Sequence, residues 1–125
     1  MKSVVNTKMA PGAIGPYSQA IKAGGFLFIS GQIPVNPANN NVVEGGIEAQ
    51  TVQVLENLAA ILNDQGLTMD NVVKTTVFLT DLNDFLAVNG IYGNYFKGET
   101  PARATIQVSR LPKEVMVEID AIAVL

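Results

Sequence analysis

Residues 47–65 follow a pattern that is typical of an α-helix. Apolar side chains recur there at steps of three and four, and further apolar residues widen the stripe into a broad face. These residues are Val52, Val54, Leu55, Leu58, Ala59, Ile61 and Leu62. Gly66 follows directly and suits the position just past a helix C-terminus. A helix with so wide an apolar face is suited to lying across a β-sheet, so strands are expected elsewhere in the chain.

Strand-like segments lie on both sides of this helix. Residues 20–30 predict two short strands joined by a turn at Gly24-Gly25. Residues 71–81 are mostly apolar or β-branched and predict a further strand. The last two strands are predicted at 102–108 and 115–124.

A second helix is predicted within residues 81–96. Its apolar face is formed by Phe85, Val88, Tyr92 and Phe96, and both phenylalanines are expected in the core. The elements then follow the order β-ββ-α-β-α-β-β. This order is typical of an α+β two-layer sandwich, with a mixed sheet of about six strands and both helices on one face. At 125 residues, we expect one domain that spans residues 1–125.

The composition predicts self-association. Charged residues are 15% of the chain and apolar residues 48%, whereas soluble domains have about 25% charged residues. A two-layer fold leaves one face of the sheet uncovered. A poorly charged monomer is one interpretation, but we favour a homo-oligomer that buries this face against another copy.

Charge and residue types exclude several functional classes. A net charge of −3 argues against nucleic acid as a partner. The chain has no cysteine and no histidine, so thiol nucleophiles, Ser-His pairs and the commonest metal sites are ruled out. No leader peptide or apolar run of membrane-spanning length is evident, and a cytoplasmic location is expected.

The last two predicted strands suggest a charged cluster. If they form a hairpin, matching polar with polar residues pairs Val108 with Val115 and places Arg103 opposite Asp120, with Glu118 on the diagonal. A solvated ion pair is the plain interpretation of such a cluster. The alternative is a small-molecule site, because an arginine fork suits a planar carboxylate and strand ends beside loops often bind ligands.

Other candidate site residues are open to two interpretations. Tyr17 could contact a ligand or pack under the neighbouring proline. Ser30 and Gly31 could offer backbone groups to a ligand or only end a strand. Asn89 could belong to a site or lie on the surface of the second helix.

Six segments taken together resemble the RidA (YjgF) family of reactive-intermediate deaminases. They are AIGPYSQA, FISGQIPVNP, VVKTTVFLTDLNDF, VNGIYGNYF, PARATIQVSRLP and VEIDAIAV, and they run from about residue 10 to the C-terminus. The resemblance implies a chorismate-mutase-like fold and a homotrimer with clefts between subunits. It also implies hydrolysis of reactive enamines and imines to 2-oxo acids and ammonia, without a cofactor or a metal.

The resemblance also implies roles for individual residues. Arg103 of the PAR segment would bind the substrate carboxylate, and Glu118 would position a catalytic water. The substrate-binding positions would further include Tyr17, Ser30, Gly31, Asn89 and Thr105. Many relatives have cysteine at the position of Thr105, so thiol-dependent behaviour cannot operate here. Asp120 stands where glutamate is more usual.

The predicted activity is that of a 2-iminobutanoate/2-iminopropanoate deaminase acting on products of pyridoxal-phosphate-dependent dehydratases. Two alternatives stay open at this point. Some relatives are described as ribonucleases or translation inhibitors, although the net negative charge and the missing histidine argue against RNA cleavage. A regulatory module that binds 2-oxo acids without turnover would use the same carboxylate site.

Overall fold

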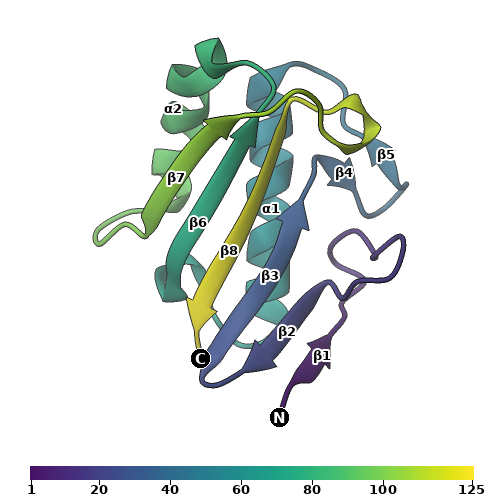
Figure 1. The fold of residues 1–125 in the computed structure, drawn as a ribbon, viewed down its shortest axis with the longest axis vertical. Helices are drawn as coiled ribbons and strands as arrows, with labels where there is room; N and C mark the ends of the chain where they lie inside the picture. The colour runs from purple at the N-terminus through teal and green to yellow at the C-terminus, as the bar shows by residue number, and fades with distance from the viewer.

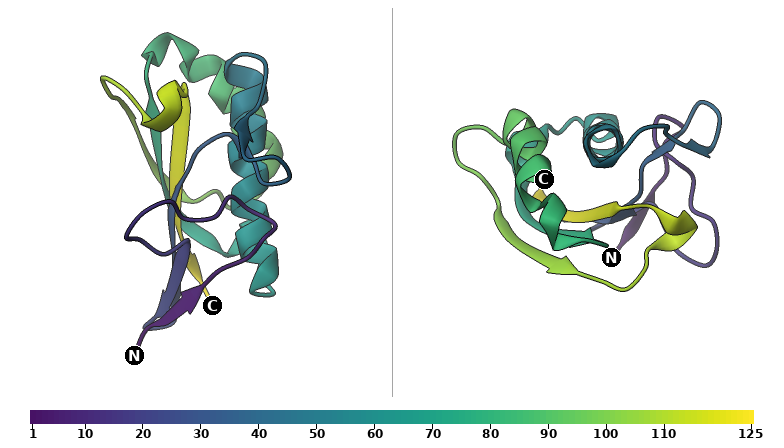
Figure 2. Two further views of the ribbon diagram at one scale, coloured as in Figure 1. Left: turned by 90° about the vertical axis from the view of Figure 1, so that its right-hand side faces the viewer. Right: turned by 90° about the horizontal axis from the view of Figure 1, so that it is seen from above.

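The computed structural model describes residues 1–125 as one mixed sheet with two helices on one face (Figures 1 and 2). In spatial order the strands are β1 (Ser3–Val5), β2 (Ala20–Ala23), β3 (Phe26–Gln32), β8 (Val117–Val124), β6 (Val72–Leu79) and β7 (Ala102–Gln107). The helices are α1 (Ile47–Asp64) and α2 (Phe85–Tyr95). The expected fold class and element order are confirmed.

Short elements complete the chain. Strands β4 (Val35–Asn36) and β5 (Asn41–Val42) form a separate two-residue ladder around a polar turn. The 3-10 turns are η1 (Met69–Asn71), η2 (Leu82–Asp84) and η3 (Pro112–Glu114). Neither helix combines the length and the apolar character that a membrane-spanning helix requires.

Helix α1 ends as its sequence predicts. Gly66 adopts a φ of +73°, and its N–H donates to the carbonyl of Asn63 at 3.0 Å. The N–H of Leu67 donates to the carbonyl of Leu62 at 2.9 Å. This pair of bonds is the Schellman arrangement, which satisfies two of the carbonyls left open at a helix C-terminus. The turn at Gly24-Gly25 also forms, with positive φ at both glycines.

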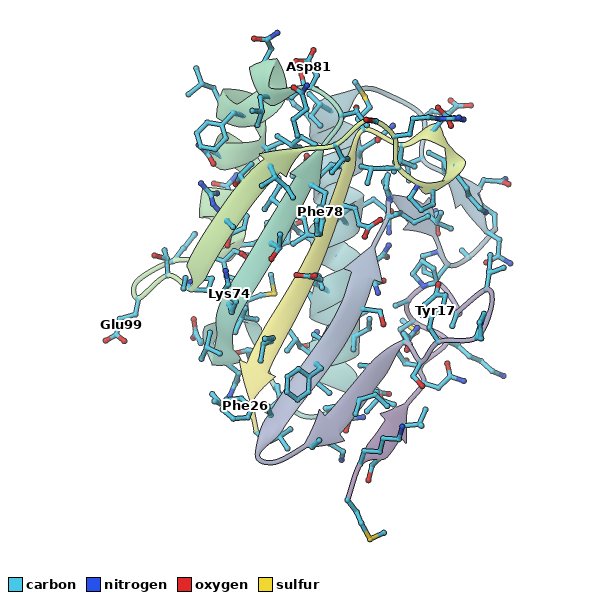
Figure 3. All side chains as sticks on the ribbon, in the orientation of Figure 1. Tyr17, Phe26, Lys74, Phe78, Asp81 and Glu99 are labelled. Carbon is cyan, nitrogen blue, oxygen red and sulfur yellow. The ribbon has the colours of Figure 1, made fainter.

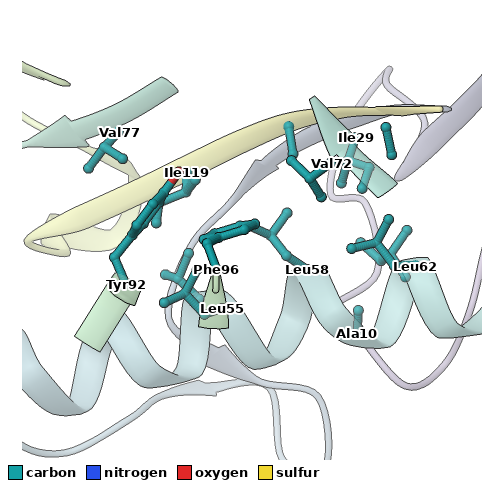
Figure 4. Close-up of a cluster of buried hydrophobic side chains, with 14 of the residues drawn as sticks. Ala10, Ile29, Leu55, Leu58, Leu62, Val72, Val77, Tyr92, Phe96 and Ile119 are labelled. Carbon is teal, nitrogen blue, oxygen red and sulfur yellow. The ribbon is translucent and has the colours of Figure 1, made fainter. Parts of the chain in front are cut away.

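The core lies between the sheet and the two helices (Figure 4). Leu55 and Leu58 of α1 are fully buried or nearly so, as are Val77 and Ile119 of the sheet. Phe96, just past α2, joins this core as expected. Phe85 does not, since it is 36% exposed, and the prediction that it is a core residue is wrong. Its position at the first turn of α2 places it beyond the covered part of the sheet and over an arginine, described below.

The predicted hairpin between the last two strands is also wrong. Strand β7 pairs in parallel with β6, whereas β8 lies between β3 and β6 and is antiparallel to both. The physical reason is burial. The helix-facing side chains of β8 are all apolar and buried, which suits a central strand: Val117, Ile119, Ala121 and Ala123. Strand β7 presents Arg103 and Thr105 on that side, which suits an edge.

The second face of the sheet has no helix over it (Figure 3). Several large apolar side chains on this open face are exposed in the single chain. They include Phe26, Phe28, Ile106 and Val124. Such a surface is unusual for a monomer, and the expected oligomer stays a prediction.

Candidate functional site

Arg103 lies at the edge of the sheet, beneath helix α2. It pairs in register with Thr75 of β6, a fully buried residue on the helix-covered face. Its Nη1 donates to Oδ1 of Asn89 at 2.8 Å. Its Cζ lies 4.8 Å from the ring centroid of Tyr92 and 5.5 Å from that of Phe85. We call Phe85, Asn89 and Tyr92 the arginine cage.

The charge of Arg103 has no carboxylate partner. The only ion pair in the chain joins Arg110 to Glu114 in the turn before β8. All three members of the arginine cage are neutral groups. A half-buried guanidinium that is oriented but not neutralised is suited to binding an anion, and its planar fork favours a carboxylate.

Thr105 places an unpaired hydroxyl on the same strand as Arg103. The two residues are separated by one position on β7 and therefore face the same side of the sheet. The Oγ1 atom of Thr105 is buried and has no hydrogen-bond partner. Buried polar atoms are nearly always paired, so a buried hydroxyl without a partner beside Arg103 is an exception in this fold.

Glu118 lies on the opposite, open face of the sheet. It is in register with Phe78 of β6 and next to Gly31 of β3, where a Cβ atom would lie 2.8 Å from the carboxyl Cδ. A side chain at position 31 would therefore displace the Glu118 carboxylate from its present place. Burial raises the pKa of Glu118 above its usual range, and the negative charge of Asp120 raises it further.

Tyr17 and Ser30 lie beside Glu118. A pocket of about 360 Å³ on this face is lined by Tyr17, Ser30, Gly31, Ile33, Pro112 and Glu118. The Ser30 hydroxyl donates to the carbonyl of Ser18 at 2.6 Å, which ties the strand to the loop that carries Tyr17. Tyr17 is 53% exposed, so its ring is free to meet a ligand or a partner.

Gln19 holds that loop in place. Its Oε1 accepts from the N–H of Thr7 at 2.8 Å, and its Nε2 donates to the carbonyl of Pro11 at 2.9 Å. The side chain is almost fully buried. The loop before β2 lacks regular structure, and this buried amide fixes it from within.

The predicted cluster of Arg103, Glu118 and Asp120 does not form. Strand β6 separates Arg103 from Asp120, and Thr76 N–H donates to Oδ1 of Asp120 at 3.1 Å. Arg103 and Glu118 lie on opposite faces of the sheet because β6 pairs Thr75 with Arg103 but Phe78 with Glu118.

The candidate residues therefore fall into two groups. Arg103, Asn89 and Thr105 form the first, and Glu118, Tyr17, Ser30 and Gly31 form the second. Sequence reasoning missed the contribution of Tyr92, since its ring fits the apolar stripe of α2. Thr75 was the available signal for Tyr92. It places a hydroxyl at a buried position of a strand, and a buried hydroxyl needs a hydrogen-bond partner.

Known proteins share the whole length and fold of the chain. The family model described as endoribonuclease L-PSP matches residues 7–125. The 2-iminobutanoate/2-iminopropanoate deaminase of Mus musculus is 49% identical over 124 residues, which are 99% of this chain and 92% of the mouse protein. The crystal structure of the Rid family protein YyfA from Yersinia pestis is 55% identical, with a TM-score of 0.97 and 100% of each chain covered. That of E. coli TdcF with bound serine is 44% identical, with a TM-score of 0.93 and 98% of each chain covered.

Proposed function

This chain belongs to the RidA (YjgF) family, and on that basis we propose that it is a 2-iminobutanoate/2-iminopropanoate deaminase. In the reaction a water oxygen bonds to the imine carbon and the carbon–nitrogen bond breaks. Both protons of the water end on nitrogen, so a 2-oxo acid and ammonia are released. The mouse relative bears the name of this activity.

The observation that carries the proposal is the unneutralised Arg103. Its fork would grip the carboxylate that every such imine has, and the free hydroxyl of Thr105 would donate to the same group. The relative TdcF has been crystallised with serine, which also bears a carboxylate next to a nitrogen-bearing carbon. Holding this carboxylate fixes the imine carbon for attack.

Glu118 would handle the water. The pKa of Glu118 is raised and so lies nearer to neutral pH. Its carboxyl group can therefore accept and return a proton more readily. It would take a proton from the attacking water and pass it to the departing nitrogen. Tyr17, Ser30 and Gly31 would line the space in which the imine carbon meets this water.

The two groups of residues would meet only between copies of the chain. Arg103 and Glu118 face opposite sides of one sheet, so one small molecule cannot touch both in a single chain. We propose a homotrimer that buries the open sheet faces and pairs Arg103 of one copy with Glu118 of the next. The exposed apolar side chains of the open face supply the driving force for assembly.

A coupled assay tests the activity. A threonine or serine dehydratase supplies the imine, and the release of 2-oxo acid is followed with and without this protein. We expect faster release with the wild-type chain and no acceleration with Arg103→Ala at unchanged oligomer mass. Arg110→Ala is the matched control, because its guanidinium pairs only with Glu114 on the surface. Wild-type rates in Arg103→Ala would overturn the assignment.

The same assay separates the alternatives. Binding of 2-oxobutanoate without any acceleration would indicate a regulatory module instead of an enzyme. The family model is described as an endoribonuclease. A net charge of −3 argues against RNA binding, and the absence of histidine removes the commonest acid–base group for RNA cleavage. RNA cleavage that is lost in Arg103→Ala would support that function in place of deamination.

A further inference from the structure

The surroundings of Arg103 are unusual in being ordered and neutral. Its guanidinium contacts two aromatic faces and one amide oxygen, and no carboxylate neutralises it. Aromatic faces attract a cation through their quadrupole without cancelling its charge. The arginine cage therefore orients the fork and leaves its charge available.

Tyr92 is itself fixed from two sides. Its hydroxyl is 2.7 Å from Oγ1 of Thr75, which is fully buried, and its ring centroid lies 4.4 Å from that of Phe96. Thr75 is the residue of β6 that stands in register with Arg103. The same strand position thus fixes both the backbone of the arginine and the ring beneath its side chain.

We propose that Phe85, Tyr92 and Thr75 are positioning residues that hold the Arg103 guanidinium ready for a carboxylate while leaving its charge unneutralised. This inference rests on the proposed function, since it assigns these residues to carboxylate binding at the same site. Thr75 acts through Tyr92, and both rings act through Arg103.

The important property of the arginine cage is that its side chains carry no charge. An aspartate at position 89 would have nearly the shape of Asn89 and would bond to the arginine more strongly. It would also neutralise the positive charge of Arg103 that the substrate carboxylate needs. A cage that only had to hold the arginine would accept this change, whereas a cage that presents the arginine to an anion would not.

The first experiment removes the aromatic face of Phe85 and, in a separate variant, the hydroxyl pair that fixes the ring of Tyr92. Phe85→Leu and the double variant Thr75→Val/Tyr92→Phe are compared with wild type, the double variant so that no buried hydroxyl is left unpaired. We expect KM for the imine and Kd for 2-oxobutanoate to rise about fivefold or more, with kcat within about twofold of wild type. Leu86→Ala and Tyr95→Phe are matched controls on the same helix, since Leu86 is 81% exposed and Tyr95 bonds to Glu56 on α1.

The second experiment changes only the charge of the cage. Asn89→Asp is compared with Asn89→Ala, and we expect the aspartate to weaken 2-oxobutanoate binding by about tenfold more than alanine does. Equal binding in the two variants, or cage variants with an unchanged KM, would overturn the inference. These failures are distinct from failure of the proposed function, which would appear as an inactive wild type or a fully active Arg103→Ala.

Discussion

Thr105 is the residue at which stability and binding are expected to conflict. Its buried Oγ1 has no partner, and an unpaired buried hydroxyl destabilises a fold by about 1–3 kcal/mol. We predict that Thr105→Val raises the free energy of unfolding by about 1 kcal/mol and weakens 2-oxobutanoate binding by about tenfold. Urea unfolding and calorimetric titration measure the two effects. Thr105→Ser, which keeps the hydroxyl, should bind as the wild type does, and a destabilised valine variant would contradict the prediction.

Glu118 should make stability depend on pH in a definite direction. Its pKa is raised in the folded chain, so the folded state binds more protons than the unfolded state between the two pKa values. The free energy of unfolding therefore falls as the pH rises through that window, and the ionised carboxylate destabilises the fold above it.

We therefore predict that Glu118→Gln is more stable than wild type at about pH 7 and that the difference shrinks toward about pH 4. It should also lose most of the proposed deaminase activity. Unfolding midpoints across this range measure the first effect, with Glu99→Gln as an exposed control. A variant less stable than wild type at every pH would show that the carboxylate makes favourable contacts instead.

At the scale of single helices, replacing two glycines by alanine is expected to change the free energy of unfolding in opposite directions. Gly66 needs its φ of +73° to end α1, whereas Gly90 lies within α2, where an added Cβ atom would meet no other atom within 4 Å. We predict that Gly66→Ala lowers the free energy of unfolding by about 1 kcal/mol and that Gly90→Ala raises it by a similar amount, about 1 kcal/mol. Chemical denaturation measures both, and equal signs for the two variants would contradict the argument.

The helices and strands could be predicted from the sequence because apolar side chains recur with a different period in each. The helix at 47–65 and the strand at 71–81 needed no knowledge of their neighbours. Strand partners are different, because side-chain alternation does not say which strand lies alongside. The sequence pattern correctly put Arg103 and Thr105 on one face, yet paired that face with Asp120 instead of Thr75. A helical crossover between β6 and β7 makes them parallel neighbours, and alternation alone cannot reveal this.

At the scale of the whole molecule, the candidate site is divided between two faces of one sheet. The motifs named Arg103 and Glu118 as residues of interest, but a single sequence does not show that one faces α2 and the other faces an open apolar surface. The low charge content did predict that surface, of which Phe28 is 43% exposed. The proposed trimer would explain both observations. Assembly would cover the exposed apolar face, and it would bring the two halves of the site together.

Mixing two inactive variants tests whether the site lies between copies. Arg103→Ala removes the proposed carboxylate-binding group and Glu118→Gln removes the proposed proton-transfer group, so each variant is expected to be inactive alone. If they are unfolded together and refolded at equal amounts, about three quarters of the proposed trimers contain both variants. Each mixed trimer then has one cleft that combines an intact Arg103 with an intact Glu118.

About one third of the clefts in mixed trimers are intact, so the mixture should recover about one quarter of the wild-type activity. Refolding each variant separately and then combining them is the control, since preformed trimers exchange no subunits at the start and should stay inactive. A site formed within one chain gives a different result, because every chain in the mixture lacks one of the two groups. The refolded mixture would then be as inactive as its parents, and the cleft between copies would have to be abandoned.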